Sequence, residues 1–285
     1  MKVDVLGIVG AGQMGSGIAQ VAAQAGIDVR LLDIEAGVAD AALSGIGRQL
    51  DKRVAKGKLA ADERDGLLQR IRPGTDYELL ADADFVIEAA TEDTTVKLAI
   101  FDRADAATPE RTVLATNTSA IPITKLAAAT RRPERVIGMH FMNPAPVMRL
   151  VELIRGLQTS DETLAAAREL AERMGKDVID ANDMPGFIVN RMLIPFLNEA
   201  CFALQENLGT PEDIDRGAKL GLNHPMGPLE LADLIGLDTV LYMAEVLHRE
   251  LGEDKYRPPT ILRNHVAAGW LGRKTGRGFY RYDQG

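Results

Sequence analysis

Cysteine is nearly absent from this sequence of 285 residues, which contains only Cys201. A disulfide within the chain is therefore excluded, and so is a redox motif built from paired cysteines. Disulfides are rare in proteins of reducing compartments, whereas small secreted proteins depend on them. The cysteine content therefore favours a reducing compartment.

Long hydrophobic runs and an excess of positive charge are also lacking. No uninterrupted apolar stretch approaches the roughly 18 residues that a membrane span needs, and the first expected strand begins almost at Met1, which leaves no room for a signal or transit peptide. The 33 basic residues are outnumbered by 41 acidic residues, and the resulting net charge of −8 argues against a nucleic-acid or membrane-surface binder. We therefore expect a soluble cytoplasmic protein without nucleic-acid or membrane partners, and no metal site.

Hydrophobic residues make up 46% of the chain, whose length is enough for one large or two medium globular domains. Strand-like and helical patterns alternate as far as a junction around Asp183 and Pro185, and only helical patterns follow it. We therefore expect an α/β domain over residues 1–183 and an all-helical domain over residues 184–285.

A glycine-rich turn follows the first expected strand, Val3 to Val9, and leads into apolar residues at helical spacing. This order is typical of dinucleotide binding, since Gly10 permits the tight turn, Gly12 lets the backbone approach a pyrophosphate, and Gly15 lets helix and strand pack closely. The turn consists of Gly10, Ala11, Gly12, Gln13, Met14 and Gly15.

The second expected strand, Ile27 to Leu32, ends at Asp33. A carboxylate at this place accepts hydrogen bonds from ribose hydroxyls and repels a 2′-phosphate, so the pattern favours NAD over NADP. The alternative is a glycine turn in an α/β domain that binds no nucleotide. The context of strand, turn, helix and acidic residue favours the cofactor, and we predict a Rossmann-type NAD-binding domain.

Residues 36–72 have a helical pattern that is interrupted at Lys56-Gly57-Lys58. Apolar residues fall on one face of each half, and Ile71 is the last of them, so we expect an antiparallel helical hairpin inserted into the domain. The hairpin contains a cluster of basic residues, Lys52, Arg53, Lys56 and Lys58. Such a cluster suits a multiply phosphorylated ligand, although a solvated basic face is the commoner explanation for any single lysine.

Two ionisable residues interrupt apolar strands in residues 138–156, GMHFMNPAPVMRLVELIRG. His140 and Glu152 stand where apolar residues are expected. A buried carboxylate needs a partner, and one that accepts from an imidazole N–H leaves the second ring nitrogen as a base. We therefore take the pair as a candidate dyad. The alternative is a core histidine and a glutamate that pairs with an arginine.

Polar residues follow two further expected strands. Phe85 to Glu88 is followed by Thr91, Glu92 and Lys97, and Val113 to Ala115 is followed by Thr116, Asn117, Thr118 and Ser119. Ligand contacts gather at the carboxyl ends of strands in open α/β sheets, so these residues indicate a site, although loops have a similar composition.

A helix is expected from Phe187 to Leu208, and its part from Phe187 to Leu204 is apolar on nearly all sides and must be buried. In a small helical domain the simplest way to bury it is against a second subunit, so we expect a homodimer with Leu197 in the interface. The alternative is a helix that is wrapped by the later helices of its own domain. Asn190 is a polar exception on this segment, close to the junction.

Over essentially its whole length the chain resembles the short-chain L-3-hydroxyacyl-CoA dehydrogenases, and most closely bacterial 3-hydroxybutyryl-CoA dehydrogenases. The motifs that carry the resemblance are GAGQMGSGIAQ, EAATED, TNTSA, IGMHFMNPAPVMRLVELIRG, DMPGFIVNRMLIP, LNHPMGPLELADLIGLD and GWLGRKTGRGFY. The resemblance implies a CoA-contacting hairpin, a helical dimerisation domain and NAD as cofactor. It also implies oxidation of (S)-3-hydroxyacyl-CoA to 3-ketoacyl-CoA, and the reverse reduction, on short chains.

The resemblance assigns roles to particular residues. The catalytic set falls on His140 as general acid and base, Glu152, Ser119 and Asn190. Cofactor contacts beyond the glycine turn fall on Asp33, Glu92, Lys97, Asn117, Asn143 and Lys274. Substrate contacts fall on Ser119, Asn190 and the hairpin, where we choose Lys56.

The chain departs from the family at Ala120, Met142 and Thr91, which are not catalytic positions, so the activity is expected and the acyl-chain preference is left open. One rival function is a dehydrogenase that acts on a free β-hydroxy acid, but such enzymes typically use a lysine base. Another is a catalytically idle NAD-binding or structural protein, against which the occupied catalytic positions argue.

Overall fold

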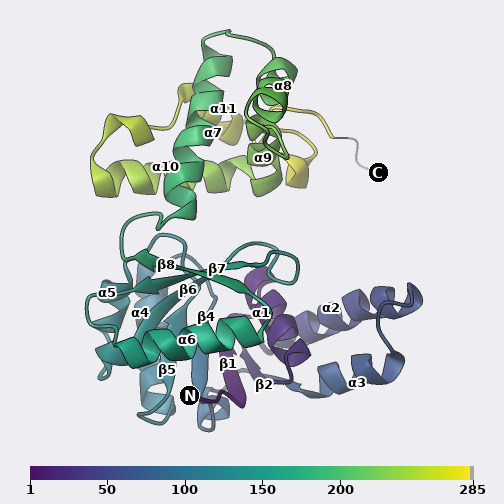
Figure 1. Ribbon diagram of the computed structural model, residues 1–285, viewed down its shortest axis with the longest axis vertical. Helices are drawn as coiled ribbons and strands as arrows, with labels where there is room; N and C mark the ends of the chain where they lie inside the picture. Colours follow the sequence, from purple (N-terminus) through teal and green to yellow (C-terminus); the bar gives the residue numbers. More distant parts are fainter. Residues whose placement is uncertain (283–285) are drawn as a thin grey trace. The chain divides into compact units, whose positions relative to one another are not determined.

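The structure is a computed structural model that describes residues 1–282 (Figure 1). The chain divides into two compact units, Met1–Met184 and Pro185–Gly285, one residue after the expected boundary. The predicted fold class, a Rossmann-type α/β domain followed by an all-helical domain, is confirmed.

An eight-stranded sheet forms the centre of the first unit, in the order β3-β2-β1-β4-β5-β6-β7-β8. Its strands are β1 (Val5–Val9), β2 (Asp28–Leu32), β3 (Ile71–Gly74), β4 (Phe85–Glu88), β5 (Val113–Thr116), β6 (Val136–Phe141), β7 (Leu150–Arg155) and β8 (Asp177–Asn182). Neighbours from β3 to β6 are parallel, β7 runs antiparallel to β6, and β8 is parallel to β7. The strand order reverses between β1 and β4, and open α/β sheets bind ligands at the carboxyl ends of the strands beside such a point.

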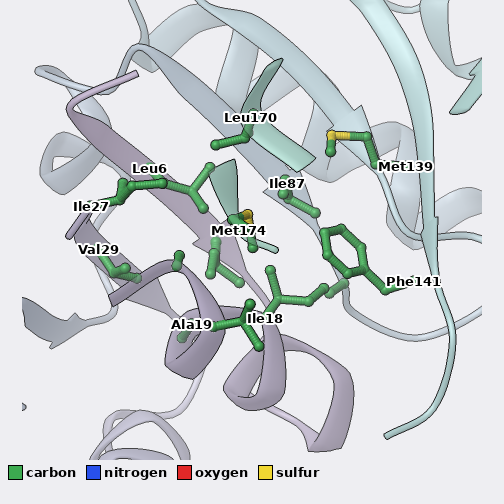
Figure 2. Close-up of a cluster of buried hydrophobic side chains, with 14 of the residues drawn as sticks. Leu6, Ile18, Ala19, Ile27, Val29, Ile87, Met139, Phe141, Leu170 and Met174 are labelled. Atoms are coloured by element: carbon green, nitrogen blue, oxygen red, sulfur yellow. The ribbon is translucent and has the colours of Figure 1, made fainter. Parts of the chain in front are cut away.

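Helices cover both faces of the sheet. The helices of the first unit are α1 (Gln13–Gln24), α2 (Ala36–Ala55), α3 (Ala61–Gln69), α4 (Thr94–Ala107), α5 (Ile123–Ala127) and α6 (Asp161–Arg173), of which α2 and α3 form the hairpin. α1 and α6 share one core with the strands, in which Ile18 and Leu170 join Leu6 and Ile87 (Figure 2). α4 packs on β4 and β5 from the opposite face (Figure 1). Burial on both faces explains why the central strands are apolar throughout.

The helical hairpin ends earlier than the sequence predicts. α2 and α3 lie side by side and extend away from the sheet (Figure 1). α3 ends at Gln69, and Ile71, which we expected on this helix, begins β3 instead. Ile71 is 4% exposed and pairs with Val29 of β2, so the sheet provides the burial that the apolar pattern requires. Pro73 is tolerated because β3 is an edge strand.

The second unit is built from helices packed around α7. They are α7 (Val189–Gln205), α8 (Pro211–Gly221), α9 (Pro228–Ile235), α10 (Leu237–Leu251) and α11 (Thr260–Ala267), of which the sequence did not predict α11. α7 contacts each of the others. Among residues 1–282, no helix has both the length and the apolar composition that a membrane crossing requires.

α7 is buried on one side within its own unit. Leu197 and Cys201 are 0% exposed and Ile194 is 2% exposed, whereas Met192 is 65% exposed. Leu197 therefore belongs to the core of its own unit, and the expectation that it lies in a subunit interface is wrong. The sequence could not separate the two cases, because a core and an interface select the same apolar residues.

Candidate active site

His140 and Glu152 lie directly opposite each other on neighbouring strands. β6 and β7 are antiparallel, and their register pairs these two residues. His140 Nδ1 is 2.7 Å from Glu152 Oε2, and the two side chains are 9% and 0% exposed. The candidate dyad is therefore a pair in space, and each residue supplies a partner that the other needs in the core.

This contact determines the chemistry of the imidazole ring. A carboxylate oxygen only accepts, so Nδ1 carries the proton that is donated to Glu152. The tautomer leaves Nε2 of His140 as the nitrogen that can take a proton from a ligand. The buried carboxylate also stabilises the imidazolium that such a transfer creates.

Glu92 and Ser119 meet beyond the carboxyl ends of β4 and β5. Glu92 Oε1 accepts hydrogen bonds from Ser119 N at 2.8 Å, from Ser119 Oγ at 3.1 Å and from Thr118 Oγ1 at 2.5 Å. Glu92 and Ser119 are half-buried. Glu92 thus holds both the backbone and the side chain of Ser119 at the edge of the sheet where ligands bind in open α/β sheets.

Asn117 connects the ends of three strands. Its backbone N–H donates to the Glu88 carbonyl at the end of β4, at 2.7 Å. Its side-chain Oδ1 accepts from the Phe141 N–H at the end of β6, at 2.8 Å. Because Phe141 follows His140, this bond helps to hold the strand that carries the histidine. The polar segment after β5 is thus held in place by hydrogen bonds to the neighbouring strands.

Asn143 lies in the exposed loop between β6 and β7. Lys176 anchors this loop, because its Nζ donates to the carbonyls of Ala145 at 2.5 Å and Met148 at 2.8 Å. Burial lowers the pKa of Lys176. This role of Lys176 could not be predicted from the sequence, since a lysine after a helix-ending glycine is usually exposed.

The glycine turn has the geometry that its motif predicts. Gly10 has a φ of +106°, and a Cβ on it would lie 2.7 Å from the Ala89 backbone. A Cβ on Gly15 would lie 1.8 Å from the Gly10 carbonyl oxygen, whereas one on Gly12 would meet nothing within 4 Å. The open space at Gly12 adjoins the N-terminus of α1, where backbone N–H groups bind a pyrophosphate. The residues of the turn therefore fit NAD.

Asp33 follows β2 at the same edge of the sheet. Its Oδ2 accepts from the Ala11 N–H at 2.8 Å, which holds the carboxylate beside the glycine turn. The side chain is half-buried and close to where the ribose of a dinucleotide lies in Rossmann-type domains.

Lys97 lies beneath this edge. Its side chain is 1% exposed, and its Nζ is 2.7 Å from Glu88 Oε1 and 3.5 Å from Glu92 Oε2. The Lys97 ammonium is thus buried against two carboxylates, whereas the resemblance implies that Lys97 contacts the cofactor directly. The sequence reasoning missed its main partner, Glu88, although a glutamate that ends the buried strand FVIE is a usable signal.

The remaining candidates lie on other elements. Lys56 is the exposed C-cap residue of α2. Asn190 is in the first turn of α7. Lys274 lies in a short 3-10 segment of the second unit, where its Nζ is 2.6 Å from Asp238 Oδ1. The structure thus brings His140, Glu152 and Asn117 together with the ends of the strands, and it places Asn190 and Lys274 in the second unit.

Comparisons with known proteins identify the family. Residues 5–184 match the model of the 3-hydroxyacyl-CoA dehydrogenase NAD binding domain, and residues 186–282 match that of the 3-hydroxyacyl-CoA dehydrogenase C-terminal domain. A probable 3-hydroxybutyryl-CoA dehydrogenase of Bacillus subtilis is 52% identical over 100% of this chain and 99% of its own. A 3-hydroxybutyryl-CoA dehydrogenase of Bradyrhizobium diazoefficiens is 50% identical over 97% of this chain and 94% of its own.

A solved structure agrees with these relatives. The crystal structure of (S)-3-hydroxybutyryl-CoA dehydrogenase from Ralstonia eutropha has a TM-score of 0.96 and 50% identity, and the match covers 99% of this chain and 100% of that one. The family models span both units, so the likeness extends well beyond the glycine turn. The chain belongs to the 3-hydroxyacyl-CoA dehydrogenase family, and its first domain is the NAD-binding domain of that family.

Proposed function

We propose that the protein is an NAD-dependent dehydrogenase that interconverts (S)-3-hydroxybutyryl-CoA and acetoacetyl-CoA. The observation that carries this function is the buried contact of 2.7 Å between His140 Nδ1 and Glu152 Oε2, at a sheet edge whose glycine turn fits NAD. The relatives that are named for this activity match over nearly the whole chain, which supports the short acyl chain.

In the oxidation, His140 Nε2 takes the proton of the substrate 3-hydroxyl. NAD held at the glycine turn would supply the acceptor for the hydride that leaves C3. Glu152 keeps the ring in the tautomer that can act as a base and stabilises the resulting imidazolium. In the reduction, His140 returns its proton to the oxygen of the 3-keto group.

Ser119 and Asn190 complete the proposed catalytic set. The Ser119 hydroxyl, held by Glu92, binds the substrate oxygen, and Asn190 binds towards the thioester. Donors that are fixed before the reaction stabilise developing charge without reorganisation, and each is worth about 3 kcal/mol in well-studied sites. Lys56 on the hairpin contributes a positive charge to the binding of the CoA phosphates.

The proposed cofactor contacts are the glycine turn, Asp33, Glu92, Asn117, Asn143, Lys274 and, through Glu92, Lys97. Asp33 gives the clearest test, because a carboxylate beside the ribose opposes a 2′-phosphate. We expect kcat/KM to be higher with NADH than with NADPH, measured at equal acetoacetyl-CoA concentration. Equal values for the two cofactors would remove this role from Asp33.

The protein is proposed to act as a cytoplasmic homodimer in fatty acid metabolism. Apolar side chains that are exposed on the second unit support an interface there, namely Met192, Leu208, Leu220, Leu222, Leu234 and Tyr242. Light scattering should give about 62 kDa, twice the 30.8 kDa of one chain. Because Leu197 is in the core, Met192→Lys is the suitable interface variant, and it should weaken the dimer without unfolding the unit. A monomer at micromolar concentration would reject the interface.

The activity is tested by following NADH absorbance at 340 nm with acetoacetyl-CoA. We expect NADH oxidation with this thioester and none with free acetoacetate, which separates the proposed function from a dehydrogenase that acts on free acids. NADH binding without turnover on any 3-ketoacyl-CoA from C4 to C16 would instead support the idle NAD-binding protein. The same panel measures the acyl-chain preference.

A further inference from the structure

Glu88 is a buried carboxylate that the proposed reaction does not use. It ends β4 and is 1% exposed. Its Oε1 accepts from the Ala90 N–H, and its Oε2 accepts from Thr116 Oγ1 at the end of β5, both at 2.7 Å. Lys97 Nζ lies 2.7 Å from both oxygens. Such a charge is stable in a core only because each of its oxygens is satisfied.

The contacts of Glu88 continue to the edge of the sheet. Lys97 also pairs with Glu92 Oε2 at 3.5 Å, and the other Glu92 oxygen holds the backbone and side chain of Ser119. Thr116 gives a second connection, because its hydroxyl oxygen accepts from the Thr118 N–H at 3.1 Å. Glu88 and Ser119 are therefore joined by one series of polar contacts through Lys97 and Glu92, and a second series through Thr116 reaches Thr118, the residue before Ser119.

We propose that Glu88 is a positioning residue for the reaction, which acts on Ser119 through Lys97 and Glu92. This inference rests on the proposed function, in which Ser119 binds the substrate oxygen. The Lys97 ammonium lies closer to Glu88, at 2.7 Å, than to Glu92, at 3.5 Å. Lys97 therefore attracts Glu92 only weakly, and the other Glu92 oxygen can accept from Ser119.

The physical reason is the competition of two carboxylates for one buried ammonium. If Glu88 becomes neutral, Lys97 has a single anionic partner, and the attraction between unlike charges is strong where water is excluded. Glu92 is then drawn towards Lys97 and away from the serine. Neutralising Glu88 should therefore weaken the hydrogen bonds between Glu92 and Ser119 more than it weakens the rest of the fold.

A matched pair of threonines in one stretch of chain separates this role from ordinary stability. Thr112 and Thr116 are both 0% exposed, and both hydroxyls donate at 2.7 Å, to the Ala83 carbonyl and to Glu88 Oε2 respectively. We expect Thr116→Val to lower kcat/KM about tenfold and Thr112→Val to change it less than about twofold. Both variants should lower the urea midpoint. Equal kinetic effects would overturn the proposal.

A double-mutant cycle tests the connection to the serine itself. Glu88→Gln should lower kcat/KM by at least about tenfold in the wild type and by less than about threefold in the Ser119→Ala variant. The two factors should differ because substitutions of coupled residues do not have additive effects. Asp105→Asn, which alters another buried ion pair of α4, serves as the control. It should change kcat/KM by the same factor in the wild type and in Ser119→Ala. An equal Glu88→Gln factor in both backgrounds would show a purely structural role. If Glu88→Gln does not fold, Thr116→Val takes its place in the same cycle.

The wild-type enzyme in these assays distinguishes the two proposals. An active wild type with additive variants rejects the role of Glu88 and leaves the function intact. A wild type that binds NADH but does not reduce acetoacetyl-CoA rejects the function. In that case a fluorescence titration with NADH tests the positioning role of Glu88. Because Glu92 is displaced in Glu88→Gln, this variant should bind NADH at least about threefold more weakly than the wild type, whereas Asp105→Asn should not. Unchanged NADH binding would then reject the role of Glu88.

Discussion

Helix α4 carries a buried ion pair at each end, and the two pairs serve different purposes. Lys97 near its start pairs with Glu88, and Asp105 near its end pairs with Arg132 at 2.6 Å. The side chains of Asp105 and Arg132 are only 5% and 6% exposed, so the second pair is nearly as buried as the first. Burial and charge alone do not tell the two apart.

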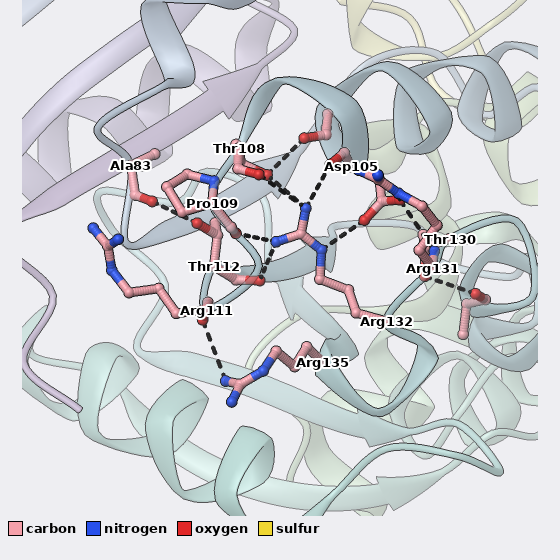
Figure 3. A network of polar contacts seen from close by, with 12 residues as sticks. Ala83, Asp105, Thr108, Pro109, Arg111, Thr112, Thr130, Arg131, Arg132 and Arg135 are labelled. Carbon is pink, nitrogen blue, oxygen red and sulfur yellow. Dashed lines mark hydrogen bonds and ion pairs between the residues drawn. The ribbon is translucent and has the colours of Figure 1, made fainter.

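The difference lies in what the partners contact next. Arg132 donates to backbone carbonyls where α4 ends and β5 begins, those of Asp105, Thr108, Pro109 and Thr112 (Figure 3). These carbonyls belong to a helix C-terminus and a tight connection, which need donors. The Lys97 pair instead leads to Glu92 and Ser119. A buried ion pair thus points to function when its contacts end in side chains at the ligand edge, and to folding when they end in backbone.

The first and largest expected effect belongs to the ligand edge. His140→Gln should lower kcat on the order of 10²- to 10⁴-fold, because general acid–base catalysis is lost. NADH affinity should stay nearly unchanged, since the nucleotide binds at the glycine turn. Stopped-flow reduction of acetoacetyl-CoA and a fluorescence titration with NADH measure the two quantities. A parallel fall in NADH affinity would contradict the assigned role.

Glu152→Gln should lower kcat about 10²-fold, because a neutral amide stabilises the imidazolium less and can favour the wrong tautomer. Steady-state kinetics with both substrates saturating measure this effect. Activity within about twofold of the wild type would return Glu152 to a structural role, comparable to that of Asp105 at the opposite end of the sheet.

Asp105→Asn should give the reverse result at the amino ends of the strands. Asparagine keeps one acceptor oxygen but loses the charge, so we expect the free energy of unfolding to fall by about 2 kcal/mol. The kcat/KM for acetoacetyl-CoA should change less than about twofold, because the contacts of the pair Asp105 and Arg132 lead to backbone carbonyls and not to the candidate active site. Urea denaturation and steady-state assays on the same preparation measure both. A large kinetic loss would abolish the contrast between the two pairs.

The smallest expected effect is a pH dependence of stability. Burial opposes the ionisation of Asp105, but hydrogen bonds from Arg131 and Arg132 outweigh it and hold the Asp105 pKa below its usual value. Because the folded-state pKa is lowered, this stabilisation is present above the unfolded-state pKa, about 3.9, and is lost as the pH falls through the folded-state value. Urea midpoints from pH 6 to pH 3 should therefore fall less steeply in Asp105→Asn than in the wild type. Parallel curves would remove the contribution of Asp105.

The sequence by itself determined the local elements of the site. The glycine turn with Asp33 predicted the NAD-binding unit, because the turn needs residues without a Cβ where the backbone crowds. His140 and Glu152 were identifiable because ionisable residues are rare in buried strands.

The tertiary structure alone decided which residues meet. The pairing of His140 with Glu152 depends on the register of β6 and β7, and the burial of Lys97 depends on Glu88 of another element. Ile71 belongs to the sheet and Leu197 to a core because partners distant in sequence supply their burial. A local pattern shows that a residue must be buried or paired, but the partner comes from long-range packing, which neighbouring residues in the chain do not encode.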